Sequence, residues 1–441
     1  MKQLSLLILF LISTIHIFAQ KELLQSGPLL GYSEMREVKI WVQTKKAAEV
    51  KIQYINQKDS KDTHWTDAVI TEKSTAFTAK LTADEVEPGN RYKYILFINN
   101  KPISFPYETV FQTLPLWKWR NDAPDFSFIT GSGAYISESQ FDRPGTPYGS
   151  DYQIYSNIAE TKADFMVWLG DNTYLRESDY NSVTGIFKRY THTRSTPEMQ
   201  KMFAVMHHYA IWDDHDYGPN DSDRSFAHKN ESFNAFQLFW PNPTFGIGDL
   251  KGAISFFSWN DCDFFLLDNR FYRTPDKSDE NSKTQLGAEQ KQWLKDALTY
   301  SDAAFKFIAI GGEFLNTSGI FETYSNFGFA EERAEIIEFI QKNNIKNVIF
   351  LTGDRHLSEV SVLERGDCPR IFDITSSPFS SGPAESPPNE VNPLRIPGSL
   401  FTQHNFTKID ITGTSKNRKL VVTFRDSDGK ILYSYDIPEQ K

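Results

Sequence analysis

Apolar and polar residues alternate in short runs through the first part of the chain. The segments 38–45, 49–56 and 91–99 place β-branched or aromatic residues at nearly every second position, which is the period of a strand with one buried face. Polar turns separate these runs, and no helical period interrupts them. The pattern predicts that residues 22–115 form an antiparallel β-sandwich of immunoglobulin or fibronectin type.

The pattern changes after a linker at 114–125. Segments with a helical period now precede continuous apolar runs, and runs without alternation are typical of strands that are covered on both faces. Residues 122–441 are therefore expected to form a layered α/β domain, in which ligands gather where strands end. The helical segments are 155–163, 287–301 and 331–344, and three further strands are expected at 406–413, 419–426 and 430–437.

Polar loops follow several of the expected strands, and they carry Asp171, Asp214, Asp354 and His356. Because the carboxyl ends of parallel strands meet at one edge of a sheet, we expect these side chains to face a shared point. Carboxylates so close together repel one another unless a cation or water relieves them. The sequence therefore predicts a metal site, since hard cations take oxygen ligands and borderline metals also accept imidazole. Taken alone, the run WDDHD at 212–216 is also typical of a solvated acidic turn.

Charge and the N-terminal segment limit the partners and the location of the protein. The 441-residue chain has a net charge of −10, whereas a nucleic-acid surface needs a basic face, so no nucleic-acid partner is expected. Residues 1–19 have the layout of a secretory signal, with Lys2, an apolar stretch and the small residue Ala19. No later segment is long and apolar enough to span a membrane. We expect an exported monomer, located in the periplasm or outside the cell.

Two further features concern cysteine usage and a low-complexity segment. Cys262 and Cys368 are the two cysteines, and they either pair with each other or remain two buried free thiols. The segment 376–393 is rich in serine and proline and has no periodicity, which predicts an irregular loop that borders the site.

The motifs GDNTYLR, WDDHDYGPND, LLDNRFYR and LTGDRH together resemble those of the alkaline phosphatase D (PhoD-like) family, which belongs to the calcineurin-like metallophosphoesterases. The resemblance extends over most of the chain. It implies a metallophosphoesterase-like sandwich of sheets and helices behind an N-terminal β-sandwich. It also implies a small phosphate ester as substrate and two or more metal ions, namely iron and calcium or other divalent metals. A metal-activated water would then attack phosphorus in line.

The resemblance assigns metal ligands by position. Asp171 matches the carboxylate that bridges two metals, and Tyr174 matches a tyrosine that binds iron through its phenolate. Asp214 stands where relatives place a metal-binding asparagine. Asp354 and His356 match the last pair of ligands.

Other residues are assigned to catalysis and substrate binding in the same way. His215 matches a catalytic histidine, which would donate a proton to the leaving alkoxide. Arg270 resembles an arginine that orients the phosphate, and the alternative is a structural pairing with Asp268. Arg176 is the second substrate-binding candidate. Asp213 is interpreted as an outward-facing neighbour and not as a ligand.

One position departs from the family pattern. Members usually read Gly-Ser-Cys where this chain has Gly131-Ser132-Gly133, and that cysteine is an iron ligand. Ser132 or a water molecule is expected to fill the coordination position, with an altered iron site because the soft thiolate is missing. Two alternatives to a phosphomonoesterase stay open, and only the second of them rests on the missing cysteine. One is a phosphodiesterase or phospholipase of the same fold, and the other is a non-catalytic relative that binds a ligand.

Overall fold

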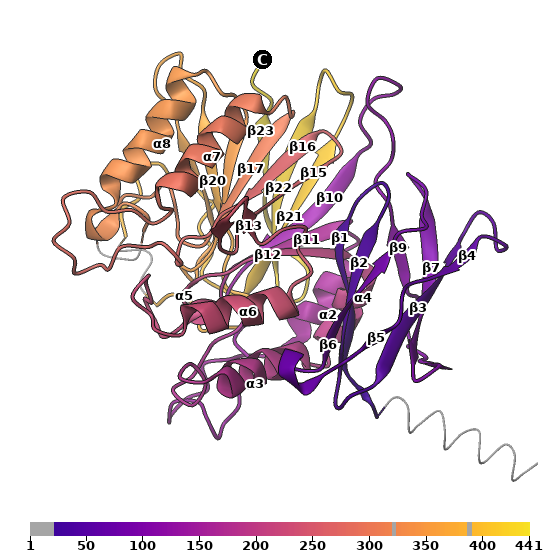
Figure 1. Ribbon diagram of the computed structural model, residues 1–441. Helices are drawn as coiled ribbons and strands as arrows, with labels where there is room; N and C mark the ends of the chain where they lie inside the picture. The colour runs from indigo at the N-terminus through magenta and orange to yellow at the C-terminus, as the bar shows by residue number, and fades with distance from the viewer. Residues whose placement is uncertain (1–21, 320–322, 386–389) are drawn as a thin grey trace, which may run out of the picture. The chain divides into compact units, whose positions relative to one another are not determined.

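A computed structural model describes residues 22–319, 323–385 and 390–441. The predicted signal segment 1–19 lies outside the described residues. The chain forms two compact units (Figure 1). The first comprises the described residues up to Leu116 together with Arg194–His208 and Leu238–Pro241, and the second comprises Trp117–Thr193, Tyr209–Gln237 and Asn242–Lys441.

The first unit is a β-sandwich, as its alternating pattern predicts. In β3 (Glu49–Asn56) every second side chain is buried, which gives the strand one core-facing side. The buried side chains of Ile52 and Tyr94 share one apolar cluster with Ile40 and Leu81 of the opposite sheet. One sheet contains β1 (Leu24–Ser33), β2 (Val38–Thr44) and β6 (Thr78–Ala83), and the other contains β3, β4 (Thr63–Trp65), β5 (Val69–Ile70), β7 (Arg91–Ile98), β8 (Lys101–Pro102) and β9 (Val110–Gln112).

Two short helices also belong to the first unit. The 3-10 helix η1 (Lys73–Thr75) lies between β5 and β6. Helix α4 (Met199–Val205) comes from a distant part of the chain, and the Tyr94 hydroxyl donates a hydrogen bond to the carbonyl of Ala204 at 3.0 Å. Distant parts of the chain therefore complete this unit.

The second unit is an α/β structure built on two sheets. One has the strand order β15-β16-β17-β18-β20-β19, in which β16, β17, β18 and β20 are mutually parallel. In the other, the parallel pair β10 and β11 lies between the antiparallel hairpins β21-β22-β23 and the end of β12. The strands of the six-stranded sheet are β15 (Ser255–Trp259), β16 (Cys262–Leu266), β17 (Phe305–Ile310), β18 (Val348–Thr352), β19 (Glu359–Leu363) and β20 (Ile371–Thr375). The strands of the other sheet in this unit are β10 (Phe126–Gly131), β11 (Phe165–Leu169), the part of β12 (His207–Ile211) from Tyr209 on, β21 (Asn405–Thr412), β22 (Lys419–Asp426) and β23 (Ile431–Pro438). A separate hairpin pairs β13 (Gly246–Ile247) with β14 (Leu250–Lys251).

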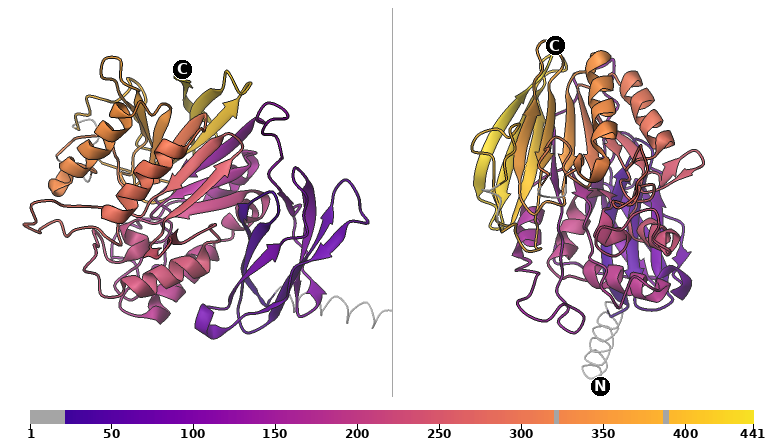
Figure 2. Two further views of the ribbon diagram at one scale, coloured as in Figure 1. Left: turned by 45° about the horizontal axis from the view of Figure 1, so that its top comes forward. Right: turned by 90° about the vertical axis from the view of Figure 1, so that its left-hand side faces the viewer.

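The core of this unit consists of two layers separated by the six-stranded sheet. Neighbouring residues of a strand face opposite sides, and Phe264 and Phe265 of β16 do so. Phe264 lies in an aromatic layer between the sheets, where its ring centroid is 5.2 Å from that of Phe128. Phe265 faces the other way, into an apolar cluster with Leu294 and Ile337. Those two residues belong to α7 (Ala288–Tyr300) and α8 (Ala330–Lys342), which cover the outer face of the sheet (Figure 2).

Most of the elements predicted for the second unit are present in the structure. The three predicted helices are confirmed as α2 (Gln153–Glu160), α7 and α8, and the three predicted C-terminal strands as β21, β22 and β23. Helices α3 (Val183–Arg194), α5 (Asp214–Tyr217), α6 (Lys229–Phe239) and η2 (Asn326–Gly328) were not predicted, nor were η1 and α4 of the first unit. Both cysteines are free, with Cys262 buried in β16 and Cys368 exposed, so the expectation of a second buried thiol is wrong. Among the described residues, the structure contains no helix of the length and apolarity that a membrane span requires.

Candidate metal centre

The loop after β11 is shaped by a close approach between two chain segments. Gly170 and Asp171 both have positive φ, at 88° and 51°. A Cβ atom at Gly170 would lie 2.6 Å from the Cβ of Asp213, so only glycine fits beside that residue. The turn buries Asp171 and brings Tyr174 back towards it, so that the Tyr174 hydroxyl donates to Asp171 Oδ2 at 3.1 Å.

Hydrogen bonds to Asp216 connect the WDDHD turn to this loop. The sequence motifs assign this residue no role. The Asp216 carboxylate is fully buried and accepts hydrogen bonds from the backbone amides of Asp213, Asn172 and Thr173, at 3.0 to 3.1 Å. Burial raises the pKa of Asp216 to about 8, although these hydrogen bonds oppose the rise. Asp216 therefore joins the two loops, a role that sequence reasoning missed.

The other acids of these loops converge. Ligand atoms of Asp171, Asp214 and His215 all lie within 4.8 Å of one another, and so do carboxylate oxygens of Asp213, Asp214 and Asp354. Burial, followed by the charges of Asp214 and Asp213, raises the pKa of Asp171 well above its usual range. Burial also opposes ionisation of Asp214, but His215 and Arg270 outweigh it and lower its pKa to about 2. The solvated acidic turn is excluded by this burial.

Asp213 differs from its sequence interpretation. Its side chain has no exposed surface, so the expectation of an outward-facing residue is wrong. The carboxylate accepts hydrogen bonds from Arg270 Nε and from Asn269 Nδ2, the latter at 2.9 Å. Asp213 thus belongs to the buried acid cluster, because residues of a later loop pair with it.

His356 enters the same centre from the loop after β18. Its Nδ1 lies 2.6 Å from the carbonyl oxygen of Gly382, which places the ring proton on Nδ1. Its Nε2 then faces the Tyr174 hydroxyl at 3.3 Å. Burial lowers the pKa of His356 to about 4, and the neutral ring is the form that binds metals. The described part of the segment 376–393 thus borders the site at Gly382.

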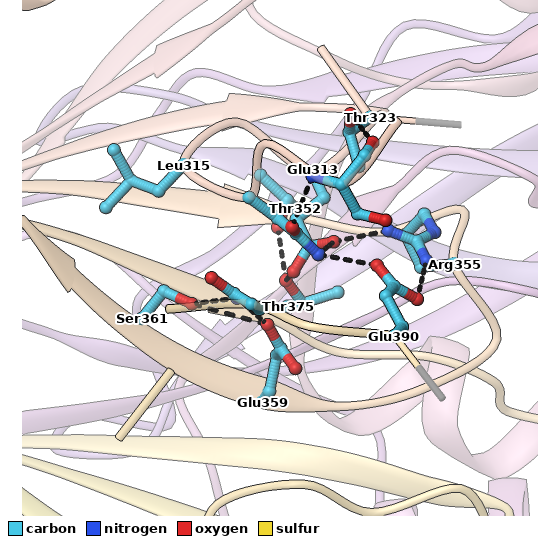
Figure 3. Close-up of polar contacts among 12 residues, drawn as sticks. Glu313, Leu315, Thr323, Thr352, Arg355, Glu359, Ser361, Thr375 and Glu390 are labelled. Atoms are coloured by element: carbon cyan, nitrogen blue, oxygen red, sulfur yellow. Dashed lines mark hydrogen bonds and ion pairs between the residues drawn. The ribbon is translucent and has the colours of Figure 1, made fainter. Parts of the chain in front are cut away.

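The conformation of the 354–356 loop is held by the side chain between its two candidate ligands. Asp354 and His356 both have positive φ, at 65° and 52°, which costs energy in non-glycine residues. Arg355 points away from the centre into a buried polar network, where it pairs with Glu313 at 2.6 Å and with Glu390 at 2.5 Å (Figure 3). These two ion pairs fix the residue around which the strained loop turns.

The two arginines assigned to substrate binding lie in different surroundings. Arg270 is fully buried and pairs with Asp213 through Nε, while another of its guanidinium nitrogens lies 3.8 Å from Asp214 Oδ1. Its backbone amide donates to Asp268 at 2.9 Å. Arg176 instead pairs with Asp142 at 2.9 Å and donates to backbone carbonyls. The geometry favours a site role for Arg270 and a structural role for Arg176.

His215 lies at the edge of the acid cluster. Its ring centroid is 4.3 Å from that of Tyr174, and the two ring planes are tilted by 34°. Its carbonyl oxygen accepts a hydrogen bond from the amide of Leu175 at 3.1 Å. The ring is therefore held between the two loops that carry Asp171 and Asp214.

The side chains present fit bound cations. Three buried carboxylate oxygens, Asp171 Oδ1, Asp213 Oδ2 and Asp214 Oδ1, have no hydrogen-bond partner among the described residues. Leaving a buried charged oxygen without a partner is costly, and a cation removes that cost. Carboxylates, a phenol and an imidazole are donors that hard and borderline metals accept.

The Ser381 hydroxyl occupies part of the space that a cysteine side chain at position 133 would need. Gly133 has a φ of 75°, and a Cβ atom there would lie 2.6 Å from Ser381 Oγ. Ser132 is buried, and its hydroxyl accepts a hydrogen bond from the Asp354 amide at 3.2 Å and donates to the Ser376 carbonyl at 3.4 Å. These contacts favour a structural role for Ser132 over the ligand role that was one of its two expected alternatives.

Comparisons with known proteins agree with this geometry. The family model for PhoD-like phosphatases matches residues 134–432, and a domain of unknown function (DUF7800) matches residues 21–115. Alkaline phosphatase D of Bacillus subtilis (strain 168) is 27% identical over 337 residues, a stretch that covers 66% of this chain and 55% of that relative. The match thus spans little more than half of the relative's length.

Solved structures show the same fold. A structure of PhoD matches with a TM-score of 0.75 at 19% identity, over 93% of this chain and 90% of the other. The purple acid phosphatase PPD1 from seeds of yellow lupin (Lupinus luteus) matches with a TM-score of 0.67 at 12% identity, over 93% and 74% of the two chains. These likenesses confirm the predicted metallophosphoesterase-like α/β fold. Because the family model matches more than half of the chain, this protein belongs to the PhoD-like phosphatase family.

Proposed function

We propose that this chain is an exported, metal-dependent phosphoesterase that hydrolyses small phosphate esters. The observation that carries the proposal is the cluster of buried carboxylates, in which oxygens of Asp171, Asp213 and Asp214 have no hydrogen-bond partner among the described residues. Membership of the phosphatase family supports it. In this proposal residues 122–441 are the catalytic domain, residues 22–115 the β-sandwich domain and residues 1–19 a secretory signal.

The candidate ligands form two sets of three side chains. Asp171, Tyr174 and His356 would hold one cation, because the Tyr174 hydroxyl lies within 3.3 Å of a donor atom of each of the other two. Asp214, Asp354 and Asp213 would hold the second. Cations bound at such a site lower the pKa of a coordinated water and neutralise phosphate oxygens. Iron and calcium are the metals that the family resemblance implies.

His215 and Arg270 would act on the substrate directly. The His215 ring is held beside the acid cluster, where it would donate a proton to the leaving alkoxide oxygen. A guanidinium nitrogen of Arg270 lies near Asp214, and the planar donor group suits a phosphate. Arg270 would therefore orient the phosphate for attack.

Charge-neutral substitutions of two ligands test this proposal. Asp171→Asn and Asp354→Asn keep the side-chain size but remove the charge that binds a cation. We expect both variants to lose bound metal in elemental analysis and to lose release of phosphate from an aryl phosphate. Asp279→Asn, on an exposed residue, is the matched control and should keep both. Wild-type metal content and turnover in Asp171→Asn would overturn the assignment.

The substrate class is tested by comparing esters. A phosphomonoesterase hydrolyses an aryl phosphate faster than a bis-aryl phosphate, and a phosphodiesterase or phospholipase shows the reverse order.

Export is tested on the protein that cells release, since signal cleavage after Ala19 leaves Gln20 as the first residue in mass spectrometry. Retention of the first 19 residues would contradict the signal.

A second candidate function is ligand binding without catalysis. Gly133 favours it, because the family's cysteine ligand is missing there. Metal analysis and turnover distinguish the two functions. A stoichiometric metal content with no turnover on monoesters or diesters would support binding alone, and turnover on either class would exclude it.

A further inference from the structure

We propose that the Ser381 hydroxyl is an oxygen ligand of the cation beside Tyr174 and His356, in the space that a side chain at position 133 would otherwise use. This inference rests on the metal-dependent function proposed above. It concerns a residue that lies outside the recognised motifs, in the loop after β20.

The first argument is the way this loop is fixed against Gly133. The backbone amides of Ser380 and Ser381 both donate to the Gly133 carbonyl at 3.0 Å. The amide of Phe379 donates to the carbonyl of Ser132 at 2.8 Å. The Ser381 side chain is fully buried by this arrangement. Its hydroxyl therefore occupies a defined position, 2.6 Å from where a Cβ atom of residue 133 would lie.

The second argument is the direction in which the hydroxyl points. Ser381 Oγ lies 3.3 Å from His356 Nε2, which is also the distance between that nitrogen and the Tyr174 hydroxyl. Because His356 Nδ1 is engaged by the Gly382 carbonyl at 2.6 Å, the lone pair of Nε2 faces both hydroxyls. Oxygen and nitrogen donors from three loops thus meet at one point.

The neighbouring serine shows that this direction is specific. Ser380 is equally buried, but its hydroxyl donates to the carbonyl of Tyr135 at 2.9 Å and contacts the Tyr155 hydroxyl at 2.9 Å. It points away from His356 and provides a matched control position. Ser381 is therefore the residue of this pair that reaches the donors.

The chemistry of the proposed ligand sets the metal preference. A hydroxyl oxygen is a hard donor, whereas a thiolate is a soft one that favours thiophilic metals. With Ser381 in place of a cysteine, the centre holds oxygen and nitrogen donors. We expect a thiol at position 381 to raise the affinity of the centre for Cd²⁺ relative to its affinity for Mn²⁺, compared with the wild type.

Cobalt titration of cysteine variants tests the inference directly. In a Cys368→Ser background, which removes the exposed thiol, Ser381→Cys should give a thiolate-to-cobalt charge-transfer band when Co²⁺ is added. Ser380→Cys in the same background should give none. Ser381→Ala should weaken Co²⁺ binding by about 10-fold, at the low end of the effects seen around metal sites.

The outcomes separate this inference from the function on which it rests. If the wild-type protein binds no Co²⁺, the proposed metal-dependent function is wrong, and so is the proposed role of Ser381. If the wild-type protein binds Co²⁺ but Ser381→Cys gives no band and Ser381→Ala binds with unchanged affinity, the role of Ser381 is overturned while the function stands. Circular dichroism of each variant shows that the fold is retained.

Discussion

The carboxylate of Asp216 accepts a hydrogen bond from the backbone amide of Asn172 at 3.1 Å, across 44 residues of sequence. The acid therefore fixes the distance between the two loops that carry the candidate ligands Asp171 and Asp214. Asp171 is buried, so its position depends on such internal contacts. The acidic run in the sequence thus combines candidate ligands with the residue that holds them in place.

Substitution of Asp216 should weaken the fold and the metal centre together. In Asp216→Asn, an amide group replaces an oxygen that accepts backbone N–H groups, so buried donors lose their partners. We expect the free energy of unfolding to fall by about 2–4 kcal/mol in urea denaturation. Metal affinity should fall as well, because the two loops separate. Asp279→Asn is the control, and an equal stability of the two variants would contradict this account.

His215 should matter most for esters with poor leaving groups. A proton donor assists an alkoxide far more than a phenolate that is already stable as an anion. We expect His215→Gln to lower kcat by about 100-fold or more for an alkyl phosphate, and much less for a nitrophenyl phosphate. Steady-state kinetics on the two esters measure the difference. An equal loss on both would point to a metal-ligand role for His215 instead.

The ion pair between Glu313 and Arg355 should position the 354–356 loop. Glu313 is fully buried, and its Oε2 accepts from Arg355 and from Asn316 Nδ2, so Glu313→Gln removes the charge that faces the guanidinium. We expect metal affinity to fall by about 10-fold, as it does when partners of ligands are removed elsewhere. Calorimetric metal titration measures this affinity.

A matched control exists on the surface of the same unit. Glu335 is exposed and pairs with Lys291 and Lys295, so Glu335→Gln breaks two surface ion pairs, each of which contributes about 1 kcal/mol at most. Its metal affinity should equal that of the wild type. If Glu313→Gln also binds metal like the wild type, the loop does not depend on this pair.

Two buried histidines should make the first unit less stable in acid. Burial lowers the pKa of His207 to about 4 and that of His208 to about 3, and each ring donates to a backbone carbonyl. In the unfolded chain a histidine titrates near pH 6.5, so below that pH the unfolded state binds more protons. The free energy of unfolding therefore falls as the pH drops from about 6.5 to about 4, by up to about 1.4 kcal/mol per pH unit for each ring.

His208→Gln isolates this effect from that of other groups. The difference in unfolding free energy between the wild type and the variant should shrink as the pH falls from 7 to 5, because only the wild type loses this contribution. Denaturant titrations at three pH values measure it. A difference that does not change with pH would contradict the assignment.

The elements with strong periodicity could be predicted from the sequence. The amphipathic segments of α7 and α8 and the alternating strands of the first unit follow directly from their patterns. The loops after β11 and β18 could also be placed, because an apolar run stops at a polar motif in each. Helices α3 and α6 were not predicted, although the apolar and polar residues of α6 are segregated about as strongly as those of α7.

The contacts that build the site could not be predicted, because they join distant residues. The burial of Asp213 depends on Arg270, which lies 57 residues away in the sequence. The relation of Ser381 to Gly133 depends on backbone pairing between two loops, and no motif marks that serine. A cysteine at position 133 would also have to displace the Ser381 hydroxyl, a conflict that sequence alone does not reveal.

Anomalous diffraction from crystals grown with Mn²⁺ tests the central claim most directly. The account predicts two anomalous peaks in the second unit, one beside Asp171, Tyr174 and His356 and the other beside Asp214 and Asp354. An anomalous map with no peak among these side chains, from crystals that contain the metal at saturating concentration, would contradict it.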